Sequence, residues 1–138
     1  MPTDPNVLGF SNRWYSGALR TAEVVSLPYD AAGSPSSIRL VSAPYFVATK
    51  LEAFADRGKG DLMSSRDIED IIAVVDGRVE LHTELQQSQD FEMRGFITGV
   101  FRAWLSEDRF LDALEGHLFD QSRFYEVKRR IEKIAQIT

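Results

Sequence analysis

Four charged side chains between residues 45 and 76 have the types and the spacing of a phosphate-binding or acid–base site. Lys50 and Arg57 are seven residues apart, so on a helix they lie about two turns apart and point to the same side. Asp67 and Asp70, three residues apart, would also share one side of a helix. Ammonium and guanidinium groups suit phosphate, whereas a carboxylate can accept a proton or orient a hydroxyl group.

Two helices joined by a glycine-containing loop must position these side chains. The first helix is expected to bury apolar residues that recur at the helical period: Phe46, Val47, Leu51 and Phe54. The second is expected to begin after a serine N-cap at Ser64 or Ser65. Its buried side is predicted from Ile68, Ile71, Ile72 and Val75. Because the charged residues border these apolar sides, we expect a polar site where the two helices meet.

Each of these residues also has a purely structural explanation. Lys50 and Arg57 could bury their aliphatic chains and extend their charged ends into solvent. Asp67 and Asp70 lie in the first turns of the second helix, where acids stabilise the helix dipole whatever their function. Arg66 could contact phosphate, or it could pair on the helix surface with Asp70, four residues later. The sequence does not rank Asp67 against Asp70, so both are candidates for a catalytic acid.

The chain of 138 residues suits a single domain, residues 1–138. We divide it into an aromatic-rich segment with a β-hairpin (1–41), the helix pair that carries the charged residues (42–76) and a helical region (77–138). The aromatic side chains Phe10, Trp14 and Tyr15 are expected to pack on the sheet. The predicted fold class is α+β, with a small β-hairpin or partial sheet packed against about six helices.

Charge and composition exclude several classes of protein. The net charge of −5 and the pI of about 5.0 argue against a surface that is basic throughout and binds nucleic acid nonspecifically. The last helix is locally basic through Arg123, Lys128, Arg129, Arg130 and Lys133. This is usually a solvated face, but it would also suit the backbone of an RNA. Cysteine is absent, and no apolar run is long enough for a signal peptide or a membrane span, so we expect a cytoplasmic protein without a membrane partner.

The charged residues also resemble a known enzyme family. Their spacing is similar to the third and fourth motifs of AbiEii/AbiGii-type nucleotidyltransferases: Lys50-x-x-Ala53-x-x-x-Arg57, followed by Arg66-Asp67-x-x-Asp70-Ile71. This family includes the toxins of bacterial toxin–antitoxin pairs. The segments Leu8–Tyr15 and Leu40–Phe46 resemble parts of the family that precede the lysine helix. The resemblance covers most of residues 1–76 and implies the C-terminal half of a nucleotidyltransferase domain.

This resemblance implies a reaction, partners and residue roles. The reaction is transfer of a nucleotidyl group from an NTP, with Mg²⁺, to an RNA such as tRNA or to a protein acceptor. An antitoxin is the further partner that it implies. Lys50, Arg57 and Arg66 would bind the phosphates of the nucleotide, and the acid of the fourth motif, Asp67 or Asp70, would be catalytic.

One part of the family pattern is absent from this sequence. The family opens with a Gly-Ser dipeptide and with aspartates that hold Mg²⁺, and this chain has no such opening. We therefore assign no metal ligand and expect no catalysis by the chain in this form, because the metal supplies the main electrostatic stabilisation of phosphoryl chemistry. The alternatives are a noncatalytic protein that binds a nucleotide or a partner, and a fragment from a misassigned start. A fragment would expose a sheet edge and could form a homodimer.

Overall fold

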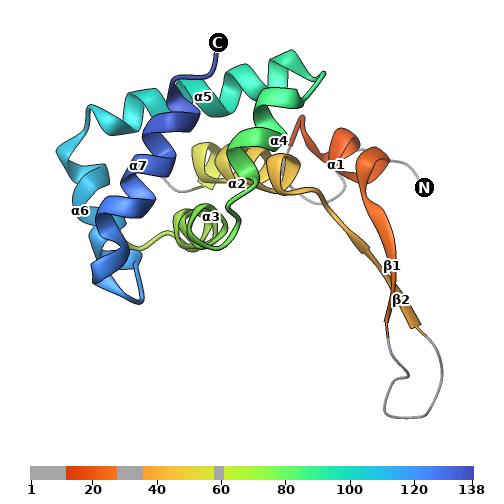
Figure 1. Ribbon diagram of the computed structural model, residues 1–138, viewed down its shortest axis with the longest axis horizontal. Helices are drawn as coiled ribbons and strands as arrows, with labels where there is room; N and C mark the ends of the chain where they lie inside the picture. Colours follow the sequence, from red (N-terminus) through yellow and green to blue (C-terminus); the bar gives the residue numbers. More distant parts are fainter. Residues whose placement is uncertain (1–11, 28–35, 58–60) are drawn as a thin grey trace.

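A computed structural model describes residues 12–27, 36–57 and 61–138, and in these residues the chain is mostly helical (Figure 1). The α-helices are α1 (Tyr15–Thr21), α2 (Ala43–Arg57), α3 (Arg66–Gly77), α4 (Leu81–Gln87), α5 (Phe91–Leu105), α6 (Asp108–His117) and α7 (Phe124–Ala135), with the 3₁₀ helix η2 (Gln121–Arg123) just before α7. Two strands, β1 (Glu23–Leu27) and β2 (Ser36–Leu40), lie between α1 and α2 in the chain. Within the described ranges, no helix combines the length and the apolar composition needed to cross a membrane.

The two strands form an antiparallel pair in which Glu23 lies opposite Leu40. The pair extends away from the helical body (Figure 1), and the side chains of Val24 and Leu40 are 65% and 48% exposed. Short strands that leave apolar side chains in solvent add little to a shared core. The predicted α+β class, with a hairpin or partial sheet packed against the helices, is therefore not confirmed. Residues 28–35, where the hairpin turn is expected, lie outside the described residues.

The hydrophobic core lies among α2, α3, α5 and α7, which pack against one another. The predicted buried side of α3 is confirmed, because its four apolar residues are each at most 2% exposed: Ile68, Ile71, Ile72 and Val75. On α2, Val47 and Leu51 are buried as predicted. Phe46 and Phe54 are only partly buried and lie at the edge of the core. The apolar period of both helices thus sets which sides face inward, and the charged residues lie at the margins.

The aromatic segment packs on a helix rather than on the strands. Trp14 is 4% exposed, and its ring centre lies 5.3 Å from that of Phe96 in α5. Tyr15 is partly exposed, and Phe10 lies outside the described residues. The prediction that this segment packs on a sheet is wrong for Trp14, because the strand pair extends away from the body and α5 provides the apolar surface instead.

A contact between α1, α2 and α5 fixes the start of α2. Gly17 lies against the Tyr45 ring, and a Cβ atom at Gly17 would come within 2.5 Å of Tyr45 Cε1. The Tyr45 hydroxyl donates to Asp90 Oδ2 at 2.5 Å, and Asp90 Oδ1 accepts from Met93 N at 3.0 Å at the start of α5. Burial, followed by the hydrogen bond to the carboxylate, raises the pKa of Tyr45. Lys50 lies just over one turn further along α2, so this contact helps to place it.

Candidate functional site

The start of α3 places its two acids opposite α2. Ser65 is the N-cap residue, and its side chain accepts from Ile68 N at 3.3 Å. This confirms Ser65 as one of the two predicted caps. Because α3 begins at Arg66, Asp67 lies in its first turn and Asp70 lies one turn later, on the side where α2 and α3 pack.

Lys50 lies between the two acids. Its Nζ atom is 2.8 Å from Asp70 Oδ2 and 3.7 Å from Asp67 Oδ1. The side chains of Lys50, Asp67 and Asp70 are 27%, 7% and 44% exposed, respectively. The structure therefore brings together three of the predicted site residues, and it confirms that a polar cluster lies where α2 and α3 meet.

Lys50 can release Asp70 more easily than it can release Asp67. Asp67 is buried, so an ion pair with Lys50 offsets part of the cost of keeping its carboxylate away from water. Asp70 is half exposed and can be rehydrated when it releases Lys50. An ammonium has three donors on a flexible chain, so an incoming anion could take the place of Asp70 while Asp67 stays beside Lys50.

The other two predicted phosphate ligands are not part of this cluster. The side chain of Arg57 lies outside the described residues. Arg66 is exposed, and within the described ranges Asp70 pairs with Lys50 instead of with Arg66. The alternative in which Arg66 pairs with Asp70 on the helix surface is not seen among the described residues, because Asp70 contacts Lys50 of α2.

A pocket of about 440 Å³ lies between α2, α3, α4 and the nearest ends of the strands, and its lining does not include Lys50, Asp67 or Asp70. Its apolar wall includes Val41, Phe46 and Val74, and its polar wall includes Arg78 and Glu84. Phe46 joins the pocket to the cluster, because Lys50 Nζ lies 5.5 Å from the centre of the Phe46 ring. Sequence reasoning missed this pocket, since its walls come from separate elements and no local pattern marks it.

The described residues do not form a metal site at the cluster. In this part of the chain, no group of three or more His, Cys, Asp or Glu side chains is placed to hold a metal ion. Mg²⁺ can be held by one or two carboxylates together with substrate phosphates, but Asp67 and Asp70 both lie beside the Lys50 ammonium. Among the described residues, the Lys50 cluster therefore does not fit a Mg²⁺ ion.

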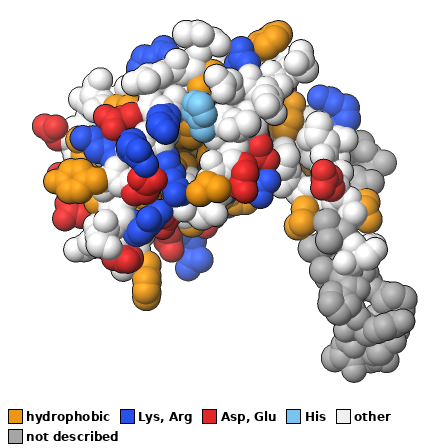
Figure 2. Space-filling view, viewed as in Figure 1, with side chains coloured by type: hydrophobic (Ala, Val, Ile, Leu, Met, Phe, Trp, Pro, Cys, Tyr) orange, Lys and Arg blue, Asp and Glu red, His pale blue; other side chains and the backbone are white. Residues whose placement is uncertain are grey.

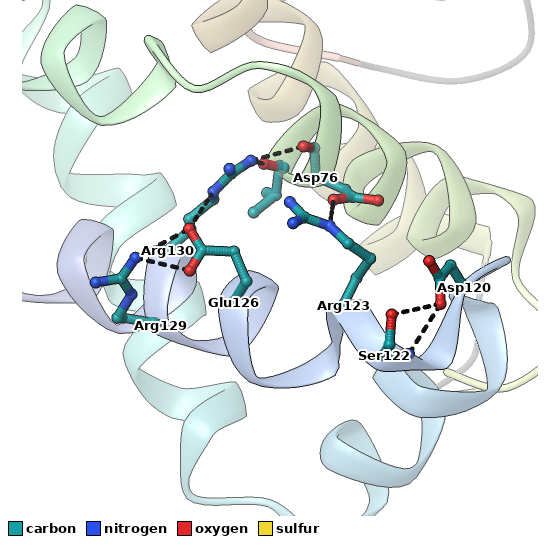
Figure 3. A network of polar contacts seen from close by, with 8 residues as sticks. Asp76, Asp120, Ser122, Arg123, Glu126, Arg129 and Arg130 are labelled. Atoms are coloured by element: carbon teal, nitrogen blue, oxygen red, sulfur yellow. Dashed lines mark hydrogen bonds and ion pairs between the residues drawn. The ribbon is translucent and has the colours of Figure 1, made fainter.

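The basic residues of α7 form a second ionic cluster, at the C-terminal end of α3 (Figure 3). Arg130 Nη1 donates to the carbonyl oxygen of Val75 at 3.1 Å and to that of Asp76 at 2.6 Å. Arg123 Nε donates to Asp76 Oδ1 at 3.0 Å. Arg130 of α7 and Arg123 of η2 thus bind the last carbonyl groups of α3 and a carboxylate beside them, which gives a structural role to two of the five basic residues predicted for the last helix.

Comparisons of the chain with family models, with curated proteins and with solved structures found no match. The resemblance to nucleotidyltransferases therefore depends on the motif residues themselves. Of these, Lys50, Asp67 and Asp70 have the geometry described above, whereas Arg66 is exposed.

Proposed function

We propose that this chain is a nucleotidyltransferase-like protein that binds the phosphates of a nucleotide at Lys50. The observation that carries this proposal is the position of the Lys50 ammonium. It is partly exposed, lies between Asp67 and Asp70, and is held where α2 and α3 meet. A lysine with an exchangeable carboxylate partner beside a pocket is a suitable point of contact for an anionic ligand.

The neighbouring pocket supports a nucleotide rather than a simple anion. Its volume of about 440 Å³ falls within the range of pockets for small organic ligands. Phe46 lines the pocket with a flat apolar ring, and the centre of that ring is 5.5 Å from Lys50 Nζ. A nucleotide would place its base and sugar along the pocket and its phosphates at the ammonium.

The proposal assigns different roles to the two acids. Asp67, which is buried, would hold Lys50 in place, whereas Asp70, which is half exposed, would release Lys50 to the ligand. Because the described residues do not fit a metal, the activity proposed for this chain is binding without turnover. Transfer to an RNA or protein acceptor, a Mg²⁺ requirement and an antitoxin partner are properties of the family that the motifs resemble, and transfer would need the metal-binding aspartates of the family pattern, which this sequence lacks.

The test is nucleotide binding by calorimetry, with each of the four common NTPs and two substitutions of opposite expected effect. Lys50→Ala should weaken binding by about tenfold or more, because it removes a charge-assisted contact to phosphate. Asp70→Asn should strengthen binding by several fold, because it removes a competing negative charge from the site. The matched control is Lys128→Ala, which removes the same charge from α7.

Two results would contradict the proposal. One is the absence of binding for all four nucleotides. The other is an unchanged isotherm for Lys50→Ala in a variant that melts cooperatively. Weaker binding after Asp70→Asn would reverse the role assigned to Asp70 and would make its carboxylate part of the ligand site.

A further inference from the structure

Lysine and arginine side chains line a groove between α4 and α7, although the protein as a whole is acidic. It consists of two cavities, of about 290 Å³ and 390 Å³, that share His82 and Lys133. The first cavity is lined by Arg78, Arg129 and Arg130 in addition to Lys133, and the second by Arg94. Figure 2 shows Lys and Arg side chains gathered over α7 beside a histidine. Among the side chains that line the two cavities, one is a carboxylate: Glu126, in the first cavity.

The cations of the groove differ in how far they are neutralised. Arg129 Nη2 donates to Glu126 Oε2 at 2.7 Å, and Arg78 Nη2 lies 2.8 Å from Glu84 Oε2. Lys133 is exposed and makes no ion pair with any residue in the described ranges. Its charge, at the junction of the two cavities, is therefore the one most available to an anion from solution.

Arg94 lines the second cavity and is held there by main-chain oxygens. Its Nη1 atom donates to the carbonyl oxygen of Gln86 at 3.0 Å, and its Nη2 atom donates to Thr138 O at 3.2 Å. These contacts hold the guanidinium in place without using all of its donors. Cationic side chains thus line both cavities, and Lys133 lines the two of them.

We propose that this groove binds the phosphate backbone of a single-stranded oligonucleotide. Two joined cavities with cations along both suit successive phosphates, whereas a single phosphate would need donors that converge on one point. The His82 ring lies at the junction and is partly exposed, so a base can stack on it. This flat ring between cations favours an oligonucleotide over an acidic peptide, which has no base to stack. None of these residues belongs to the Lys50 cluster, so the inference does not depend on the proposed nucleotide site.

The test measures binding of a fluorescently labelled oligo(U) 12-mer by anisotropy over a range of salt concentrations. Lys133→Glu should weaken binding by about tenfold or more and should reduce the slope of log affinity against log salt by about 0.7 for each phosphate contact that is lost. Lys128→Glu on the same helix changes the net charge equally and should have a much smaller effect, because Lys128 lines neither cavity. His82→Ala should weaken binding by about fivefold or more with little change in the salt slope.

Several outcomes would overturn the inference. These are no binding of the oligonucleotide, equal effects of Lys133→Glu and Lys128→Glu, and equal affinity for oligo(U), for pyrophosphate and for a glutamate 12-mer. Thermal unfolding by circular dichroism verifies that each variant is folded, which is expected because Lys133 is exposed. Lys50→Ala should leave oligonucleotide binding unchanged, so a failure of the nucleotide site and a failure of the groove can be told apart.

Discussion

The two ends of α3 are each held by cations from a neighbouring helix, but the cations are used differently. Near the N-terminal end, Lys50 of α2 contacts the carboxylates of Asp67 and Asp70. At the C-terminal end, Arg130 of α7 contacts the main-chain oxygens of Val75 and Asp76. The last carbonyl groups of a helix have no hydrogen-bond donor within the helix, and any fold must supply one from elsewhere. Arg130 supplies it for Val75 and Asp76. Within the part of the chain that the structure describes, Lys50 contacts side chains and no carbonyl group at the end of a helix.

The helix dipole sharpens this contrast. A cation is favoured at the C-terminal end of a helix and disfavoured near the N-terminal end. Arg130 therefore lies where the main chain of α3 attracts it. Lys50 lies beside the first turns of α3, where two carboxylates are needed to make its position favourable. The position of Lys50 therefore depends on its two carboxylate partners, whereas that of Arg130 is favoured by the main chain itself.

The largest effect is expected at the C-terminal end. Arg130→Met keeps an aliphatic chain on α7 but removes the donors to Val75 O and Asp76 O, which leaves partly buried oxygens without that partner. We expect the free energy of unfolding to fall by about 2 kcal/mol. Urea denaturation followed by circular dichroism measures this change.

Arg129→Met is the matched control for this prediction. Arg129 neighbours Arg130 on α7, but its side chain is 61% exposed, and its one ion-pair partner among the described residues is Glu126. Its loss should change the free energy of unfolding by about 0.5 kcal/mol or less. Equal losses of unfolding free energy in the two variants would show that the carbonyl contacts of Arg130 stabilise the fold no more than a surface ion pair does. The contrast between the two ends of α3 would then fail.

The Lys50 end of α3 could be predicted from the sequence because its pattern is local. The apolar residues of α2 and α3 fix which sides are buried, and Ser65 fixes where α3 begins. The segment between the two helices is short, so they were expected to be neighbours. These facts bring Lys50 close to Asp67 and Asp70 without any knowledge of the rest of the chain.

The other end could not be predicted in the same way. Arg130 and Asp76 are separated by 54 residues, and no periodicity links them. The sequence shows that the last helix is basic, but it does not show which arginine reaches α3. The same limit explains the aromatic segment, because the Trp14 partner Phe96 lies far along the chain. The β-branched residues indicated strands correctly as local elements, but they do not determine whether a strand pair packs on the helices.

A smaller effect is expected from the ion pair between Lys50 and Asp70. A double-mutant cycle with Lys50→Met, Asp70→Asn and the double variant isolates the pair from the other contacts of each residue. Because Asp70 is 44% exposed, the coupling free energy should be about 0.5 kcal/mol. A coupling of about 2 kcal/mol or more would mean that the pair serves the fold, and Lys50 would then be poorly suited to exchange Asp70 for phosphate.

The smallest effect concerns the pH dependence of the ionic cluster at the C-terminal end of α3. Hydrogen bonding from Arg129, with a smaller contribution from Arg130, lowers the pKa of Glu126. Because the pKa in the folded state lies below the ordinary value, the stabilisation is present above that ordinary value and is lost as pH falls through the folded-state pKa. Arg129→Met should return the Glu126 pKa toward its ordinary value, and Arg130→Met should do so less.

An NMR titration of the side-chain carboxyl carbons measures this shift directly. Asp120 is the internal control, because its pKa is lowered mainly by hydrogen bonds from Ser122 and should not respond to the loss of Arg129. A larger response of Glu126 to Arg130→Met than to Arg129→Met would contradict the division of roles on α7. Arg130 would then act mainly on a carboxylate, as Lys50 does, and the two ends of α3 would be alike.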